Sequence, residues 1–321
     1  MTKTNRVTPA SESTDNFMLH KNLPLADYTT WHVGGAADLV YQPNSLEELQ
    51  QFLAKFATTN SDTPIYWLGL GSNVLIKDSG IRGLVVLTNS GSNIGLNNFE
   101  IQTTSSHGKI ITCEAGVPCA KLAKFLAKNN YPGGAFLAGI PGTMGGALAM
   151  NAGCYGSETW DHVIKVDVID RQGNITQLKP SDFVIGYRTV KAKNPPFNAQ
   201  EFWFVRAYLQ FTQDDSISGV EAIKSLLQKR TSQQPIGLFS GGSVFRNPPG
   251  NFAGKLIEAA GLKGYTIGGA EISPKHANFI INNKTATAKD IEDLITHAQN
   301  IVFANTGIKL ETEIRIIGEE K

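Results

Sequence analysis

Residues 133–153 read GGAFLAGIPGTMGGALAMNAG, and seven of these twenty-one residues are glycine. Glycine is used where a Cβ would collide with a neighbour or where φ is positive, and it weakens ordinary helices and strands. The density is too high for the interior of a regular helix or strand. We therefore expect a loop whose backbone is closely approached, and the leading candidate for the approaching group is a phosphate.

A second glycine-rich turn, Gly69-Leu70-Gly71-Ser72-Asn73, follows the apolar run 65–68. A strand that leads into an amide-rich loop is a common way to bind a diphosphate. Either loop alone could equally be a tight turn. Neither matches the spaced glycines of the dinucleotide fold or the phosphate loop of triphosphate-binding proteins. Two separate loops without a Mg²⁺ site favour a flavin dinucleotide.

Length and composition indicate a multidomain globular protein. The chain has 321 residues, 41% of them hydrophobic and 18% charged, so two or three domains are expected. With 29 basic and 28 acidic residues, the net charge of +1 gives no sign of a nucleic-acid-binding surface. No apolar run approaches a membrane span, and the N-terminus lacks the apolar segment of a signal peptide. We expect a cytoplasmic protein without nucleic-acid or membrane partners.

The three cysteines are Cys113, Cys119 and Cys154. They lack CxxC spacing, and neither His nor Cys stands at metal-ligand spacing to any of them. We expect small buried thiols and no metal site.

The order of patterns along the chain predicts an α+β fold. Residues 1–16 are polar and are expected to form a disordered tail. Residues 45–56 open with a Ser45/Glu48 capping box and place apolar residues at helical spacing. Short β-rich runs then occupy 83–211, interrupted by one helix that Pro118 begins. They comprise residues 84–87, 109–114, 163–169 and 202–209.

From about Ser216 the pattern changes to helices separated by loops. We expect helices over 220–230, 253–260 and 287 to about 304, the last with a Thr287/Asp290 box and an end near Gly307. Residues 308–317 alternate apolar and charged positions and are expected to form one strand with a buried face.

Several polar residues permit two interpretations. Ser243 lacks the surroundings of a hydrolase serine and, from the local pattern, reads as a turn residue. Tyr187-Arg188 reads as a solvated pair, and Glu311, Glu313 and Arg315 read as a solvent-facing row. His32 could be a covalent flavin anchor but more commonly would be a half-buried strand residue, and His276 likewise favours a structural role.

Taken in order, six motifs resemble the UDP-N-acetylenolpyruvoylglucosamine reductase (MurB) family. The resemblance runs from about Asn22 to the C-terminus. Each motif alone is only weakly specific for the family, but the set is highly specific because the order and spacing of the motifs also agree. The motifs are Thr30-Trp31-His32-Val33-Gly34-Gly35, Gly69 to Leu75, Gly139-Ile140-Pro141-Gly142 through Asn151-Ala152-Gly153, Gly186-Tyr187-Arg188, Gly242 to Pro248, and Leu310 to Arg315.

The resemblance implies an FAD-binding domain of the vanillyl-alcohol-oxidase (PCMH) type and a smaller α+β C-terminal substrate domain. The expected division is a disordered tail at 1–16, a first FAD-binding subdomain at 17–82 with 308–321, a second at 83–214, and a substrate domain at 215–307.

The resemblance also implies an enzyme of peptidoglycan synthesis. Such an oxidoreductase reduces UDP-N-acetylglucosamine enolpyruvate to UDP-N-acetylmuramate, with non-covalent FAD as cofactor and NADPH as co-substrate. We expect a monomer. Hydride goes to the vinyl carbon distal to the ether oxygen, and negative charge develops on the carbon that bears the carboxylate, where cations and hydrogen-bond donors would stabilise it.

Motif positions carry roles over from the family. Arg188 matches the arginine that stabilises the enolate, Glu313 the glutamate that assists it, and Ser243 the serine that delivers the proton. The substrate-binding positions are Tyr187, Asn247 and Arg315. The flavin-binding positions are Gly69, Leu70, Gly71, Ser72, Asn73, Gly139, Ile140, Pro141, Gly142, Gly145 and Gly146.

Two departures from the family pattern narrow the expectation. Residues 189–191 lead directly to a strand without the inserted tyrosine-bearing loop of one branch, which favours the shorter-loop branch. Gln233 stands where some members have a lysine for the substrate diphosphate. Two alternatives are a flavin oxidase on the same fold and a non-catalytic module that binds UDP-sugars.

Overall fold

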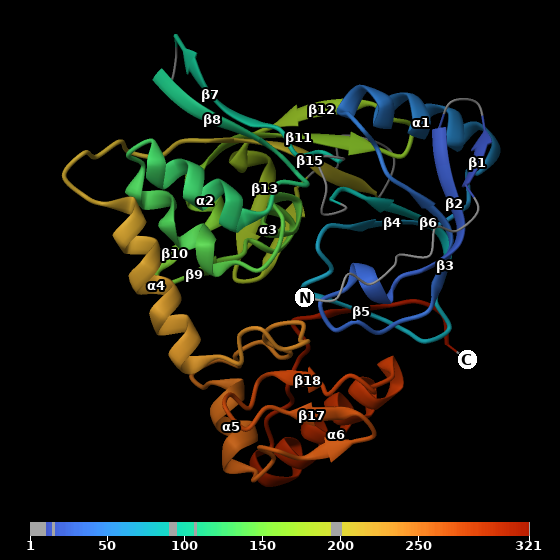
Figure 1. The fold of residues 1–321 in the computed structure, drawn as a ribbon, viewed down its shortest axis with the longest axis vertical. Coiled ribbons are helices and arrows are strands. Elements are labelled where there is room, and N and C mark those ends of the chain that lie inside the picture. The colour runs from blue at the N-terminus through green and yellow to red at the C-terminus, as the bar shows by residue number, and fades with distance from the viewer. Residues whose placement is uncertain (1–10, 15–16, 90–94, 106–107, 194–200, 321) are drawn as a thin grey trace.

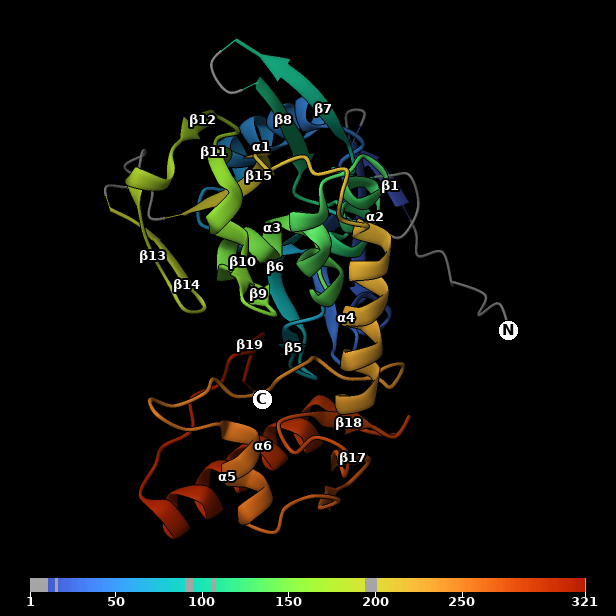
Figure 2. The ribbon, with the colours of Figure 1, turned by 90° about the vertical axis from the view of Figure 1, so that its left-hand side faces the viewer.

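In a computed structural model of the chain, the structure describes residues 11–14, 17–89, 95–105, 108–193 and 201–320. Two adjoining sheets with their helices form the upper part of Figure 1, and a smaller C-terminal unit lies below them. Helix α4 (Gly219–Gln233) runs down one side and leads from the upper part to the lower one (Figures 1 and 2). This mixture of helices and sheets confirms the predicted α+β class.

The first sheet has the strand order β1-β2-β3-β6-β4. Helix α1 (Leu46–Thr59) buries Leu46, Leu49, Phe52, Leu53 and Phe56, as the helical spacing predicts. Its N-cap is also confirmed, because Ser45 Oγ accepts the Glu48 N–H at 3.1 Å. The strands are Ser11–Thr14 (β1), Phe17–Pro24 (β2), Ala36–Tyr41 (β3), Ile65–Leu68 (β4) and Ile81–Leu87 (β6).

The disordered tail expected at residues 1–16 is wrong for Ser11–Thr14. These residues pair antiparallel with β2. Backbone hydrogen bonds to an edge strand need no apolar side chains, so composition could not reveal this strand; residues 1–10 and 15–16 lie outside the described part. Strand β6 crosses the expected boundary between residues 82 and 83, and we therefore propose that the first subdomain extends to Leu87.

The second sheet is antiparallel, with the order β12-β11-β15-β8-β7. The glycine-rich stretch covers one face together with α2 (Cys119–Lys128), and it is more regular than we expected. It forms the 3₁₀ helix η2 (Pro132–Gly139) and the short helix α3 (Met144–Met150). The strands are Phe99–Thr104 (β7), Gly108–Glu114 (β8), Val163–Asp170 (β11), Ile175–Leu178 (β12) and Phe202–Leu209 (β15).

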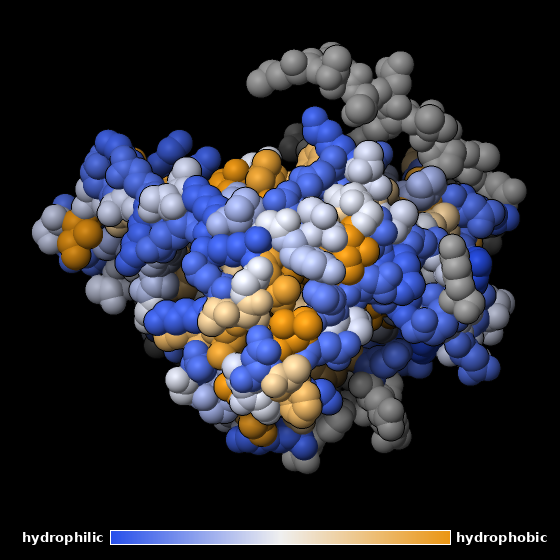
Figure 3. Space-filling model, turned by 90° about the horizontal axis from the view of Figure 1, so that it is seen from below, coloured by the Kyte–Doolittle hydropathy of each residue, from blue (hydrophilic) through white to orange (hydrophobic). Residues whose placement is uncertain are grey.

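The C-terminal unit contains α5 (Ala253–Ala259), the small sheet β16-β17-β18 and α6 (Ala288–Thr306). The Thr287/Asp290 capping box is present, and Gly307 ends α6 with φ of +71°. Seen from below, this end is largely hydrophilic, with hydrophobic side chains gathered toward the middle (Figure 3). The strands are Thr266–Ile267 (β16), Ala270–Ile272 (β17) and Ile280–Asn282 (β18).

The single strand expected over 308–317 is wrong for most of its length. Only Arg315–Ile317 form a strand, β19, which pairs parallel with β5 (Val74–Ile76). Leu310 and Ile314 are buried as predicted, but Ile316 is 36% exposed. The apolar alternation therefore reflects packing on the C-terminal core rather than a continuous ladder.

No helix in the described ranges combines the length and the hydrophobicity that a membrane crossing requires.

Trp31 joins the two parts of the molecule. It is fully buried in the core of the C-terminal unit, although it belongs to the N-terminal third of the chain. Its Nε1–H donates to the Ile280 carbonyl at 2.8 Å, and its carbonyl accepts from Asn282 Nδ2 at 2.7 Å.

We expect Trp31→Phe to lower the free energy of unfolding by about 1–3 kcal/mol, because the buried Ile280 carbonyl would lose its donor. Thermal or chemical denaturation measures this change. Phe303→Leu, at an exposed position on α6, should leave stability nearly unchanged. Equal stability of the two variants would contradict the role assigned to Trp31.

Candidate functional site

Tyr187 and Arg188 form the two-residue tip of the hairpin made by β13 (Phe183–Gly186) and β14 (Thr189–Ala192). Arg188 has φ of +54°, a left-handed conformation that costs a residue with a Cβ about 1–2 kcal/mol. Its guanidinium carbon lies 5.0 Å from the centre of the Tyr187 ring. Such strain persists where the surroundings impose it, often at functional sites.

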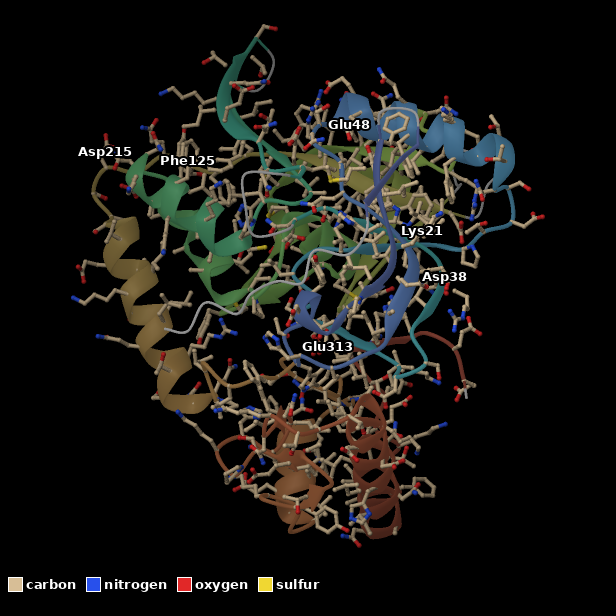
Figure 4. All side chains as sticks on the ribbon, turned by 45° about the vertical axis from the view of Figure 1, so that its right-hand side comes forward. Lys21, Asp38, Glu48, Phe125, Asp215 and Glu313 are labelled. Carbon is tan, nitrogen blue, oxygen red and sulfur yellow. The ribbon has the colours of Figure 1, made fainter. Side chains whose placement is uncertain are left out.

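The guanidinium of Arg188 does not extend into solvent. Its Nε donates to Glu313 Oε1 at 2.6 Å, and Nη2 donates to the Gly153 carbonyl at 3.3 Å. The two side chains are only 19% and 14% exposed. Figure 4 places Glu313 where the C-terminal unit meets the upper sheets. The solvent-facing interpretation is therefore wrong for both Arg188 and Glu313.

Ser243 lies on a segment that Asn278 holds in place. The Asn278 side chain accepts from the Phe245 N–H and donates to the Phe245 carbonyl, and its own carbonyl accepts from the Val244 N–H. The Val244 carbonyl in turn accepts the Glu313 N–H at 2.8 Å. Ser243 and Glu313 therefore lie on two chain segments that are hydrogen-bonded to each other.

These residues line one cavity of about 410 Å³. It brings together Tyr187, Arg188, Ser243, Asn247 and Glu313, all predicted from the sequence motifs. Arg315 does not line it; that residue is exposed, and its N–H donates to the Asn73 carbonyl. A larger groove of about 860 Å³ between α2 and α4 contains none of the predicted site residues.

The cavity also contains charged residues that no sequence motif identified. Lys255 and Lys275 line it, and neither has a carboxylate within ion-pair distance among the described residues. The nearby acid, Glu258, is paired with Lys263 at 2.6 Å. The two lysines therefore add unpaired positive charge to the cavity, which suits an anionic ligand. Its lysines come from α5 and from the loop before β18, so no local pattern connected them.

His276 also lines the cavity, and its ring orientation is defined. Nδ1 accepts the Asn278 N–H at 3.2 Å, which requires Nδ1 to be unprotonated and places the proton of the neutral ring on Nε2. Burial lowers the pKa of His276 below its usual 6.5, and the Lys263 ammonium acts in the same direction while Glu258 opposes it. His276 is therefore neutral at pH 7, and its hydrogen bond to Asn278 is in keeping with the structural role expected, although the residue also lines the cavity.

The two predicted flavin loops touch each other. A Cβ on Gly69 would lie 2.4 Å from Thr143 Oγ1, and one on Gly142 would lie 3.1 Å from Ser72 Oγ. Neighbouring protein atoms leave no room for a Cβ at other glycines either. A Cβ on Gly71 would meet the Tyr28 carbonyl, and one on Gly139 would meet Cys154 Sγ.

Gly146 differs from these glycines, because no protein atom lies within 4 Å of the position that its Cβ would take. It lies exposed on α3, near the loop 69–73 that follows β4. Within the described residues, the N–H groups of Leu70, Gly71 and Ser72 donate to no protein acceptor. Free amides beside open space fit the diphosphate of a dinucleotide.

Three further residues bear on the expectations. His32 is wrong as a half-buried strand residue: it lies exposed in a turn with φ of +55° against the Phe239 ring. Cys113 and Cys119 are buried as expected, and burial raises the pKa of Cys119 to about 12.

Among the described residues, no group of three or more His, Cys, Asp or Glu could hold a metal ion.

Two family models match the chain. The model for an FAD binding domain matches residues 37–179, and the model for the C-terminal domain of UDP-N-acetylenolpyruvoylglucosamine reductase matches residues 234–317.

Proteins named UDP-N-acetylenolpyruvoylglucosamine reductase align over nearly the whole chain. The protein from Coxiella burnetii (strain Dugway 5J108-111) is 49% identical, over 92% of this chain and 94% of its own. The protein from Methylococcus capsulatus is 46% identical, over 97% and 96%. The crystal structure of that reductase from Thermus caldophilus superimposes with a TM-score of 0.72 at 30% identity, over 92% of this chain and 97% of the other. The expected fold is thus confirmed.

The lowered pKa of His276 makes stability depend on pH. Below pH 6.5 the unfolded chain binds a proton on this side chain that the folded protein binds less readily, so stability falls as the pH decreases through about 6.5. We expect His276→Gln to lose less stability than the wild type between pH 7.5 and 5.5. Denaturation at several pH values measures this, and parallel curves for the two proteins would contradict it.

Proposed function

Because the chain belongs to the UDP-N-acetylenolpyruvoylglucosamine reductase family, we propose that it reduces UDP-N-acetylglucosamine enolpyruvate to UDP-N-acetylmuramate with NADPH, in peptidoglycan synthesis. The observation that carries the proposal is the single cavity lined by Arg188, Ser243 and Glu313. We further propose a cytoplasmic monomer without nucleic-acid or membrane partners; the net charge of +1 is in keeping with the absence of a nucleic-acid partner.

FAD would be held without a covalent bond by the touching loops 69–73 and 139–146. The free N–H groups of residues 70–72 would donate to its diphosphate, and Gly146 would leave room for the cofactor. When bound, FAD accepts a hydride from NADPH and passes it to the substrate. The first subdomain, extended to residues 17–87 with 308–321, and the second, then 88–214, would together form this domain.

The chain's own residues would perform the remaining chemistry. As hydride adds to the distal vinyl carbon, negative charge moves onto the neighbouring carbon and its carboxylate, where the guanidinium of Arg188 stabilises it. Glu313 fixes the direction of that guanidinium through the 2.6 Å hydrogen bond. The Ser243 hydroxyl then donates its proton to the carbon that bears the carboxylate. Position rather than acidity makes this serine effective.

The two lysines of the cavity would bind the diphosphate of the substrate. Gln233 provides no charge where some relatives have lysine, and Lys255 and Lys275, which line the cavity, would supply it instead. Tyr187 and Asn247 line the same cavity and would contact the UDP-sugar. Arg315, which lies outside it, would act by anchoring the loop through Asn73.

Anaerobic half-reactions test this function. The purified protein is reduced with NADPH, UDP-N-acetylglucosamine enolpyruvate is added, and the flavin absorbance is followed. Recovery of the oxidised spectrum is expected. Reduction without recovery would exclude this substrate. Reduction of the flavin by an alcohol, followed by its reoxidation by oxygen, would favour the flavin oxidase. Binding of the UDP-sugar without any hydride transfer would favour the non-catalytic module.

We expect Ser243→Ala to reduce flavin with NADPH at nearly the wild-type rate but to reoxidise with substrate about 10²–10⁴-fold more slowly, the usual contribution of general acid catalysis. Stopped-flow absorbance separates the two steps. Equal slowing of both steps would remove the proton-donor role from Ser243.

Gly146→Ala tests the flavin position. In the flavin-free protein this change should be neutral or slightly stabilising, because alanine favours a helix and its Cβ meets no protein atom. FAD affinity should nevertheless fall. The comparison variant Gly145→Ala would place a Cβ 3.0 Å from Ala115 Cβ and should destabilise the flavin-free protein itself. Unchanged FAD affinity in Gly146→Ala would place the cofactor elsewhere.

A further inference from the structure

Arg246 lies three residues after Ser243 and is directed toward the catalytic hairpin. Its Nη2 donates to the backbone carbonyl of Arg188 at 3.2 Å, and its N–H donates to the Glu311 carbonyl at 2.9 Å. Its Nε is buried and has no hydrogen-bond partner in the described part of the chain. None of the roles predicted from the sequence motifs falls on this side chain.

The conformation of Arg188 explains why such a contact matters. A left-handed residue at the tip of a two-residue turn is strained, and rotation of its peptide planes would redirect the guanidinium. The bond from Arg246 fixes the carbonyl end of Arg188. Bonds to Glu313 and to the Gly153 carbonyl fix the side-chain end. Arg188 is therefore held at both ends, from different parts of the fold.

The energetics do not favour a role of Arg246 in stability alone. A buried N–H without an acceptor has lost its hydration without gaining a compensating hydrogen bond, which destabilises the folded protein. No carboxylate lies within ion-pair distance of Arg246 among the described residues. An apolar side chain of similar length would avoid this cost. Such a cost is typically kept where a function needs the group.

We propose that Arg246 is a positioning residue for Arg188: its hydrogen bond to the Arg188 carbonyl maintains the left-handed turn that directs the catalytic guanidinium to Glu313 and to the substrate carboxylate. This inference rests on the proposed reductase function. Arg246 acts only through Arg188, so it affects the step in which charge develops on the substrate and leaves flavin reduction by NADPH unaffected.

Arg246→Met tests the proposal, since methionine retains much of the length of the side chain without its donors. We expect the variant to be as stable as the wild type or more stable, and to reduce flavin with NADPH at the wild-type rate. Reoxidation by UDP-N-acetylglucosamine enolpyruvate should slow at least about tenfold, equivalent to about 1.4 kcal/mol in the barrier, with little change in KM. Arg246→Lys, which retains a donor, should recover part of this rate.

Two comparisons make the test specific. Arg82→Met removes an exposed arginine paired with Asp38 and should leave both half-reactions unchanged. In an Arg188→Lys background, Arg246→Met should have little additional effect, because residues that act through one another are not additive.

Wild-type reoxidation in Arg246→Met, equal slowing of both half-reactions, or full additivity with Arg188→Lys would each overturn the proposal. These outcomes are distinct from failure of the proposed function, in which the wild-type protein itself would not reoxidise with the substrate.

Discussion

The ion pair between Arg188 and Glu313 is the interaction on which the site depends. A largely desolvated pair is favourable only if its geometry is good and its other polar atoms are satisfied. The surrounding structure holds the two residues in this geometry from three directions. The β13–β14 hairpin carries Arg188, the Val244 carbonyl accepts the Glu313 N–H, and Asn73 Nδ2 donates to the Glu313 carbonyl. The loop 69–73, the β13–β14 hairpin and the C-terminal unit therefore meet at this ion pair.

The loop 69–73 connects the Arg188–Glu313 ion pair to the glycine-rich stretch 133–153. Asn73 ends the loop that touches residues 142 and 143, and Asn151, at the end of α3, donates to the Gly186 carbonyl at the base of the hairpin. Most glycines here lack a Cβ because another chain segment occupies that volume. A movement of the loops would therefore reach both partners of the ion pair, which links the proposed cofactor cradle mechanically to the catalytic groups.

Local rules predicted the elements whose signals lie within one segment. The caps at Ser45 and Thr287 and the left-handed Gly307 mark helix ends, because the relevant hydrogen bonds join residues three or four apart. Strand β1 and the irregular path of 308–314 depend on partners distant in sequence, so composition and alternation misassigned them. The residues that line the cavity divide in the same way, into those with a local sequence signal and those without one.

The motifs named Arg188, Ser243 and Glu313, but Lys255, Lys275, His276 and Arg246 become related only in three dimensions. No periodicity connects α5, the loop before β18 and the segment that contains Arg246. The sequence taken alone therefore gave no signal that Lys255, Lys275 and His276 line one cavity or that Arg246 contacts Arg188.

The distribution of charge in the cavity separates binding from chemistry. In the part of the chain that the structure describes, Lys255 and Lys275 have no carboxylate partners and would be available to the proposed substrate, whereas Arg188 is already paired with Glu313. An unpaired arginine would bind the ground-state carboxylate strongly, and stabilisation shared by ground and transition states does not raise the rate. In the proposed function, pairing would moderate that ground-state attraction while it keeps the guanidinium in place for the charge that develops during hydride transfer. A protein with almost no net charge could then bind an anionic nucleotide through the cavity lysines and keep a restrained cation for the proposed chemistry.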